Sequence, residues 1–240
     1  MVSKDNAAAL TTTTSARFGY YAAMATTGMT IVTFGFALTA IPISGANCPD
    51  ACIAYPYLDT AAQFLRDFLW MPLAILLMLS YVALLVSIHS VAPHTMRVFS
   101  QTGLAFALIA ATILMTDYYL QFAVVPVSLM HHETDGLPLL IQYNAHGVFI
   151  ALEELGYLLM SLSFLFMAPV FARRSRLEVA IQWLFVTSSV LSFGALAVVS
   201  AIYGLDRQDR FEIVIISINW LVLIVAGVLL SIVFRRRLHT

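Results

Sequence analysis

Long apolar runs separated by short polar segments dominate this chain. An α-helix needs about 20 apolar residues to cross the roughly 30 Å of hydrocarbon in a bilayer. Runs of this length predict helices over residues 20–42, 68–88, 103–124, 147–168, 177–203 and 213–234. Because they take up most of the chain, we expect an all-α integral membrane protein, with residues 1–240 forming one polytopic domain of six transmembrane helices.

The composition agrees with a membrane environment and excludes other classes. Apolar residues make up 61% of the chain and charged residues only 10%, whereas soluble domains average about 25% charged residues. The net charge is −1, so there is no basic excess of the kind that nucleic-acid binding requires. The lipid bilayer is therefore the expected partner, and no nucleic acid is expected.

The basic residues predict the orientation, because cytoplasmic loops carry the excess of Lys and Arg. The topology places Arg66, Arg207 and Arg210 on one side and all the other basic residues on the opposite side: Lys4, Arg17, Arg97, Arg173, Arg174, Arg176, Arg235, Arg236 and Arg237. We therefore expect both termini in the cytoplasm and the protein in the plasma (inner) membrane. The first apolar run exceeds the 7–15 residues of a signal-peptide core, so it is interpreted as a retained span.

The only two cysteines, Cys48 and Cys52, share the first outer loop. In an oxidising compartment this pair predicts a disulfide that closes a small loop. Two cysteines alone cannot complete a structural zinc site, and a redox motif would more usually be spaced C-x-x-C.

Three acids fall inside the predicted spans: Asp117, Glu153 and Glu154. A carboxylate at the bilayer centre costs about 2.5–3.5 kcal/mol, so intramembrane acids face protein or water and often mark a functional site. By the ~1.5 Å rise per residue, Asp117, Glu153 and Asn219 all lie ~10 Å below the outer edge. A third span continuing to Met130 would move Asp117 towards the midplane, but Pro126 favours an earlier break.

Helical spacing indicates which of these groups share a face. Asp117 and Gln121 stack on the third span, and the fourth span carries a stripe of His146, Phe149, Glu153 and Tyr157. Adjacent residues point about 100° apart, so Glu153 and Glu154 can both avoid lipid only if neighbours cover a wide sector of their helix. This predicts that the fourth helix is central in the bundle.

These positions predict an acidic vestibule that opens to the outer side. Its expected ligand-binding residues are Arg66, Trp70, Asp117, Gln121, Glu153, Glu154, Tyr157 and Asn219, with Asp67 and His146 beside them and His131, His132, Gln142 and Asn144 as a lid. Carboxyl groups this close cannot all stay ionised, so at least one should hold a proton. Alternatively, Arg66 pairs with Glu153 or Asp117, and the cluster serves helix assembly.

A metal site is a further hypothesis. His131, His132 and His146, together with the acids, are suitable ligand types for a transition metal, but their spacing matches no known metal motif. His89 and His94 lie at the cytoplasmic end with no facing pair, so haem is not expected. The cofactor otherwise remains unidentified.

Three functions fit these features. The first is a binding or transport protein whose outer acidic site holds a proton, a cation or a small amphipathic ligand; the apolar inner half favours binding over a continuous pore. The second is a membrane enzyme that acts on a lipid or isoprenoid-like substrate by carboxylic acid/base or His/carboxylate metal chemistry. The third is a structural subunit of a larger membrane complex. Homo-oligomers are compatible with all three.

Overall fold

The structure is a computed structural model that describes the chain except for residues 1–3, 40–42, 51, 59–67, 172–174 and 239–240. Every regular element in the described part is helical. The long helices are α1 (Lys4–Thr39), α3 (Trp70–Ser90), α4 (Arg97–Ala123), α7 (Val148–Met167), α8 (Arg176–Tyr203) and α9 (Gln208–Arg237). Short helices connect them: η2 (His94–Met96), α5 (Val125–Met130), α6 (Leu137–Leu140), η3 (Ala168–Phe171) and η4 (Gly204–Arg207).

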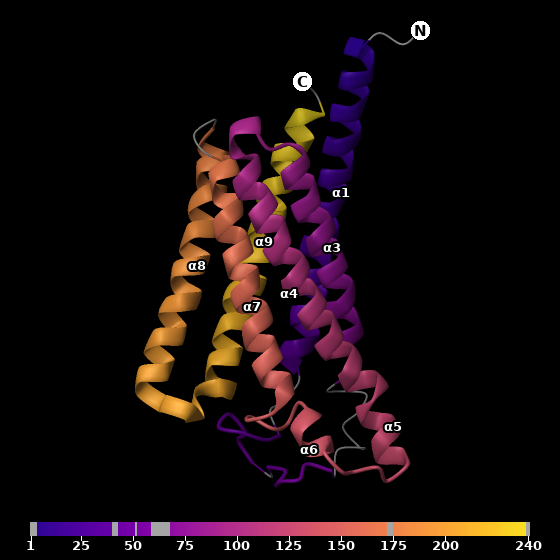
Figure 1. The fold of residues 1–240 in the computed structure, drawn as a ribbon, viewed down its shortest axis with the longest axis vertical. Helices are drawn as coiled ribbons and strands as arrows, with labels where there is room; N and C mark the ends of the chain where they lie inside the picture. The colour runs from indigo at the N-terminus through magenta and orange to yellow at the C-terminus, as the bar shows by residue number, and fades with distance from the viewer. Residues whose placement is uncertain (1–3, 40–42, 51, 59–67, 172–174, 239–240) are drawn as a thin grey trace.

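Five segments of the described chain are long and apolar enough to cross a membrane: Thr13–Thr39, Trp70–Ser90, His94–Met130, Val148–Phe171 and Arg176–Arg237. The last has 62 residues, well over twice what one crossing requires. It contains both α8 and α9, which reverse direction at η4 and pack side by side (Figure 1). Gly204 starts this turn with a positive φ of 60°, a conformation that favours glycine. All six predicted helices are therefore present.

The largest difference between a predicted and an observed helix end is at the start of α1. α1 begins at Lys4, well before the predicted residue 20, and residues 40–42 at the predicted end lie outside the described residues. The break expected near Pro126 is present, because α4 ends at Ala123 and α5 starts at Val125. Asp117 thus lies six residues, or ~9 Å, from the end of α4.

Five of the long helices form a closed ring. α1 packs on α3, α3 on α4, α4 on α7, α7 on α9, and α9 on α1, while α8 lies outside the ring against α7 and α9 (Figure 1). The prediction of a central fourth helix needs correction, because α7 is part of the ring wall. With neighbours on both flanks, it still buries both Glu153 and Glu154, which are 0% and 6% exposed.

Large side chains fill the inside of the ring, and small residues let the helices approach. Tyr81, Tyr118, Tyr157 and Trp220 are at most 1% exposed. Where α1 crosses α9, a Cβ added to Gly227 would lie 3.0 Å from the Ala23 carbonyl oxygen and closer still to the Thr27 hydroxyl. The absence of a side chain at this position sets the separation of the two helices.

The two ends of the bundle differ. Both termini lie at one end, here called the terminal end (Figure 1). The opposite end, here called the loop end, carries residues 43–50 and 52–58, the segment from α5 to the start of α7, and η4. Arg97, Arg176 and Arg235 lie at the terminal end, and Arg207 and Arg210 at the loop end.

Candidate functional site

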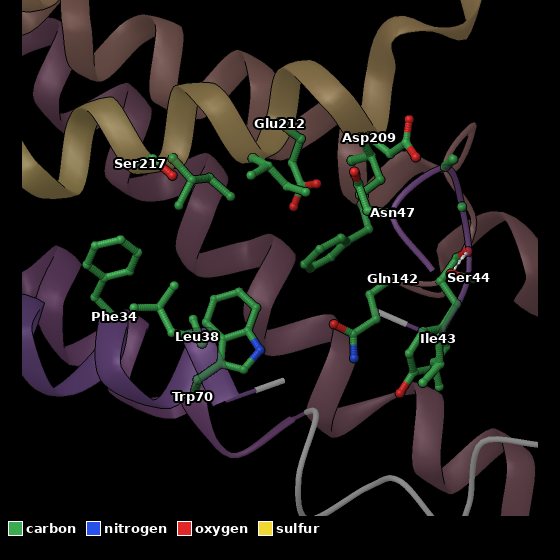
Figure 2. A pocket seen from close by; sticks show the side chains of 18 of the residues that line it. Phe34, Leu38, Ile43, Ser44, Asn47, Trp70, Gln142, Asp209, Glu212 and Ser217 are labelled. Atoms are coloured by element: carbon green, nitrogen blue, oxygen red, sulfur yellow. Dashed lines mark hydrogen bonds between the residues drawn. The ribbon is translucent and has the colours of Figure 1, made fainter. Parts of the chain in front are cut away.

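A cavity of about 330 Å³ lies at the loop end (Figure 2). Its walls come from α1, α3, the start of α7, α9 and the loops before α3 and α7. The aromatic lining residues are Phe34, Trp70, Tyr143, Phe149 and Trp220, and the polar ones are Ser44, Asn47, Gln142, Asp209, Glu212 and Ser217. The cavity is thus largely apolar, with a few polar groups, as small-molecule sites usually are.

The loop that covers the cavity is held by side chains of other elements. The Ser44 hydroxyl donates to the Tyr143 carbonyl oxygen at 2.7 Å, and the Ala46 amide donates to Asp209 Oδ2 at 2.7 Å. The predicted disulfide between Cys48 and Cys52 is confirmed, with an S–S distance of 2.05 Å. The disulfide therefore closes a loop whose preceding segment, residues 43–47, contributes to the cavity wall.

Glu212 is the acid of α9 that faces the cavity (Figure 2). Its carboxyl group lies within hydrogen-bonding reach of that of Glu153, which is fully buried. The sequence did not place Glu212 among the predicted site residues, because it precedes the last predicted span, residues 213–234, by one residue. Its spacing along the helix could have identified it as a buried residue. Glu212 lies seven residues before Asn219 and eight before Trp220, which places all three on one helix face.

A chain of hydrogen bonds leads from Trp220 to Glu153. Trp220 Nε1 donates to the Tyr157 hydroxyl at 2.8 Å, the Tyr157 and Tyr118 hydroxyls are 2.8 Å apart, and Tyr118 donates to Glu153 Oε1 at 2.7 Å. Since the Tyr118 proton is used on Glu153, Tyr157 donates to Tyr118. Every donor in this series of hydrogen bonds therefore points towards Glu153.

Asp117 completes the acid cluster from α4. It is 2% exposed and lies close enough to Glu153 and Glu212 for their charges to interact. Its Oδ2 atom has no hydrogen-bond partner among the described residues. The structure thus brings together Asp117 and Glu153, as the sequence predicted, and adds Glu212 to them.

Glu154 pairs with a basic side chain and not with a carboxyl group of this cluster. Its Oε2 accepts a hydrogen bond from Arg207 of η4 at 2.8 Å, and the Arg207 side chain is 26% exposed. Of the two adjacent glutamates, Glu153 therefore contacts the cavity acid Glu212, and Glu154 forms an ion pair. Arg66 and Asp67, which the sequence placed in the vestibule, lie outside the described residues.

Two predicted site residues have other contacts. Gln121 Nε2 donates to the Leu140 carbonyl oxygen at 2.5 Å, and its Oε1 accepts from the Gln142 amide at 3.0 Å, so Gln121 holds the end of α6 and the residues after it against α4. Asn219 lies among serines of α7 and α8, where Ser161 donates to its Oδ1 at 3.2 Å. Neither belongs to the acid cluster.

The two predicted aromatic residues are at the site. Trp70 lines the cavity and lies edge-on to Tyr118, with ring centroids 5.1 Å apart. Tyr157 is fully buried in the hydrogen-bond chain behind the cavity. In Figure 2 the Trp70 indole nitrogen and the Glu212 carboxyl group face the open space between them.

The structure does not bring the candidate metal ligands together. His131 and His132 are exposed in the turn after α5, and His146 Nδ1 lies 3.3 Å from Gln208 Oε1 at the start of α9. In the described part of the chain, no three His, Cys, Asp or Glu side chains are arranged to hold a metal ion. Asn144, a predicted lid residue, instead holds its own turn by donating to the Pro138 carbonyl oxygen at 2.8 Å.

Comparison with known proteins gives no family model, no curated protein and no solved structure that matches this chain. Its function is therefore inferred from the geometry of the site.

Proposed function

We propose that this chain is an integral membrane protein that binds a small amphipathic organic cation in the loop-end cavity. The observation that carries the proposal is the position of Glu212, whose carboxyl group faces a cavity walled by Trp70, Phe149 and Trp220 (Figure 2). Aromatic faces attract organic cations, most strongly in a desolvated site, and a carboxyl group supplies the charge partner. The cavity volume of about 330 Å³ suits a ligand of one ring and a short chain.

The charges around the cavity support a cation over an anion. Asp209 and Glu212 both line it, and the described lining contains no Lys, Arg or His. The two described arginines of the loop end have partners of their own. Arg207 pairs with Glu154, and Arg210 donates to the Asp206 carbonyl oxygen at 2.7 Å and lies 4.3 Å from the Tyr203 ring centroid. An anion would therefore face uncompensated negative charge.

The packing beyond the acids supports binding over conduction. Further towards the terminal end, the ring interior is filled by side chains such as Leu77, Tyr81 and Leu84, all at most 1% exposed. The excess of basic residues at the terminal end supports a cytoplasmic location for both termini, so the cavity would lie near the outer surface. Within the described residues, no comparable observation favours an enzyme or a structural subunit.

Three probes of similar shape test the proposal: phenethylamine as the cation, phenethyl alcohol as the neutral form and phenylacetate as the anion. Tryptophan fluorescence reports binding, because Trp70 and Trp220 line the cavity. The third tryptophan, Trp183, is 64% exposed on α8 and is removed by Trp183→Phe. We expect the amine to bind at least about tenfold more tightly than the alcohol, equivalent to about 1.4 kcal/mol, and phenylacetate to bind least.

Two matched variants check that Glu212 is the charge partner. Glu212→Gln should abolish the preference for the amine over the alcohol. Glu178→Gln neutralises a buried glutamate at the terminal end, where it lies 3.7 Å from Arg237, and should leave the preference intact. Equal affinity for all three probes in the unmodified site, or an unchanged preference in Glu212→Gln, would contradict the proposal.

A further inference from the structure

We propose that Glu153 and Glu212 share one proton, and that a cation in the cavity weakens their hold on it, so that cation binding and protonation oppose each other. This inference rests on the proposed function and adds control by pH to the same site.

The contact between the two carboxyl groups requires the proton. An ionised carboxylate has only acceptor atoms, so two of them can hydrogen-bond only if one is protonated. Glu153 Oε2 is buried and receives no hydrogen bond from a described donor when both groups are ionised. A proton between Glu153 and Glu212 satisfies that atom. Independently, Asp117 Oδ2 is buried beside the pair without a partner among the described residues, so a third carboxyl group crowds the site and the three cannot all be ionised together.

The chain of hydrogen bonds assigns the shared proton to Glu212, the glutamate that faces the cavity. Trp220, Tyr157 and Tyr118 all direct their donors towards Glu153 Oε1, and donated hydrogen bonds stabilise a carboxylate. Glu153 is therefore the carboxylate of the pair, and Glu212 carries the proton. Since Glu212 lines the cavity (Figure 2), the proton lies where a cation would approach.

The other charged and titratable groups around the pair favour this state. α4 contributes Asp117 and Tyr118, α7 contributes Glu154 and Tyr157, and α9 and η4 contribute Asp209 and Arg207. The loop before α7 contributes Tyr143, which lines the cavity. The described faces of α1 and α3 at the cavity present Phe34, Leu38 and Trp70, which do not titrate. Arg207 is the only cation in this described set, and Glu154 engages it.

A positive charge in the cavity reverses the balance. When a cation binds, the O–H bond of Glu212 breaks, the proton leaves to water, and the carboxylate so formed contacts the cation. Because linked equilibria are reciprocal, the same interaction makes the cation bind more tightly as pH rises through the titration of the pair. The step involves no oxidation or reduction.

Benzyltrimethylammonium tests this coupling, because its charge does not change with pH. Binding is measured by tryptophan fluorescence of the full chain in detergent, in the Trp183→Phe background, from about pH 5 to about pH 9. We expect its affinity to rise with pH by up to about tenfold per unit within the titration range. Proton release is followed in weakly buffered solution with an indicator dye, and binding should release protons in that same range.

Glu153→Gln is the diagnostic variant. A glutamine can accept from Tyr118 through Oε1 and donate to Glu212 through Nε2, so Glu212 no longer needs the shared proton. We expect the variant to bind the probe with an affinity that changes little with pH and to release few protons. Glu178→Gln at the terminal end should keep the pH dependence of the unmodified chain.

The outcomes separate this inference from the proposed function. Binding that is independent of pH and releases no proton overturns the coupling and leaves cation binding intact. The same pH dependence in Glu153→Gln as in the unmodified chain overturns the assignment to this pair. Absence of binding at every pH, for this probe and for phenethylamine, overturns both proposals.

Discussion

The Tyr118 hydroxyl of α4 donates to Oε1 of Glu153 in α7 at 2.7 Å. Both side chains are fully buried, so this bond joins two neighbouring helices of the ring in an environment where water cannot replace it. A lost partner there leaves a buried acceptor unsatisfied, which costs more than the net gain of an ordinary hydrogen bond. The Tyr118 hydroxyl thus links the stability of the bundle to the protonation of its acid cluster.

Tyr118→Phe should therefore destabilise the protein by about 1–3 kcal/mol. The variant keeps the aromatic ring of residue 118 but leaves Glu153 Oε1 without its hydrogen-bond donor. Thermal unfolding in detergent measures the effect as a lower Tm. Tyr119→Phe is the matched control, because Tyr119 is the next residue and is 57% exposed. Equal Tm values for the two variants would contradict the structural role of the Tyr118 hydroxyl.

Arg207→Gln should destabilise the loop end, since it leaves the Glu154 carboxylate buried without its 2.8 Å ion pair. We expect a loss of about 1–3 kcal/mol, because Arg207 is only partly buried and fully buried pairs lose more. The double variant Glu154→Gln with Arg207→Gln should recover most of this loss. Urea unfolding measures all three stabilities, and a double variant no more stable than Arg207→Gln would argue against an isolated buried charge as the cause.

Gly227→Ala should destabilise the crossing of α1 and α9. The added methyl group would lie 3.0 Å from the Ala23 carbonyl oxygen and would overlap the Thr27 hydroxyl, and overpacking of this kind costs about 1–3 kcal/mol. Gly194→Ala in α8 is the control, because a Cβ there has no described neighbour within 4 Å. The expected result is a lower Tm for Gly227→Ala alone. A similar Tm for both variants would show that the close approach is not needed.

The proposed orientation places the Cys48–Cys52 loop outside the cytoplasm. In sealed right-side-out membrane vesicles, a membrane-impermeant reductant followed by a membrane-impermeant maleimide should label these cysteines without permeabilisation. For comparison, Arg236→Cys in a chain carrying Cys48→Ser and Cys52→Ser places a thiol at an exposed position of the terminal end. That thiol should react only after permeabilisation. The opposite pattern would reverse the orientation.

Prediction of the site succeeded where a residue's own helix decides its position. Asp117 and Glu153 lie inside apolar runs, so the cost of exposing a carboxylate to lipid required both to face protein, and the structure brings them together. Gln121 and Asn219 are polar and lie at similar depth, but the partners of Gln121 come from the end of α6 and the segment after it, and Asn219 meets Ser161 of α7. Helical spacing could not indicate which of several polar neighbours each would meet.

Glu212 shows the opposite case. Hydropathy assigns it to the rim, because it stands at the polar edge of an apolar run, although its spacing from Trp220 places it on the buried face of α9. Arg207 was likewise counted as a loop residue, and the turn of η4 brings it to Glu154. In both cases the contact joins α7 to the η4–α9 segment, and the hydropathy of one segment does not specify such a contact.

The linear order of residues was sufficient to define the six helices, the break before Pro126, the disulfide and the burial of the intramembrane acids. These properties follow from local hydrophobicity, backbone chemistry and short separations along the chain. Only the packed bundle determined that five helices form a ring with α8 outside, that Glu212 meets Glu153, and that Trp70 and Trp220 enclose a cavity beside them. Those relationships join side chains from helices far apart in the chain, and they depend on which helix faces meet, which hydrophobic periodicity alone does not specify.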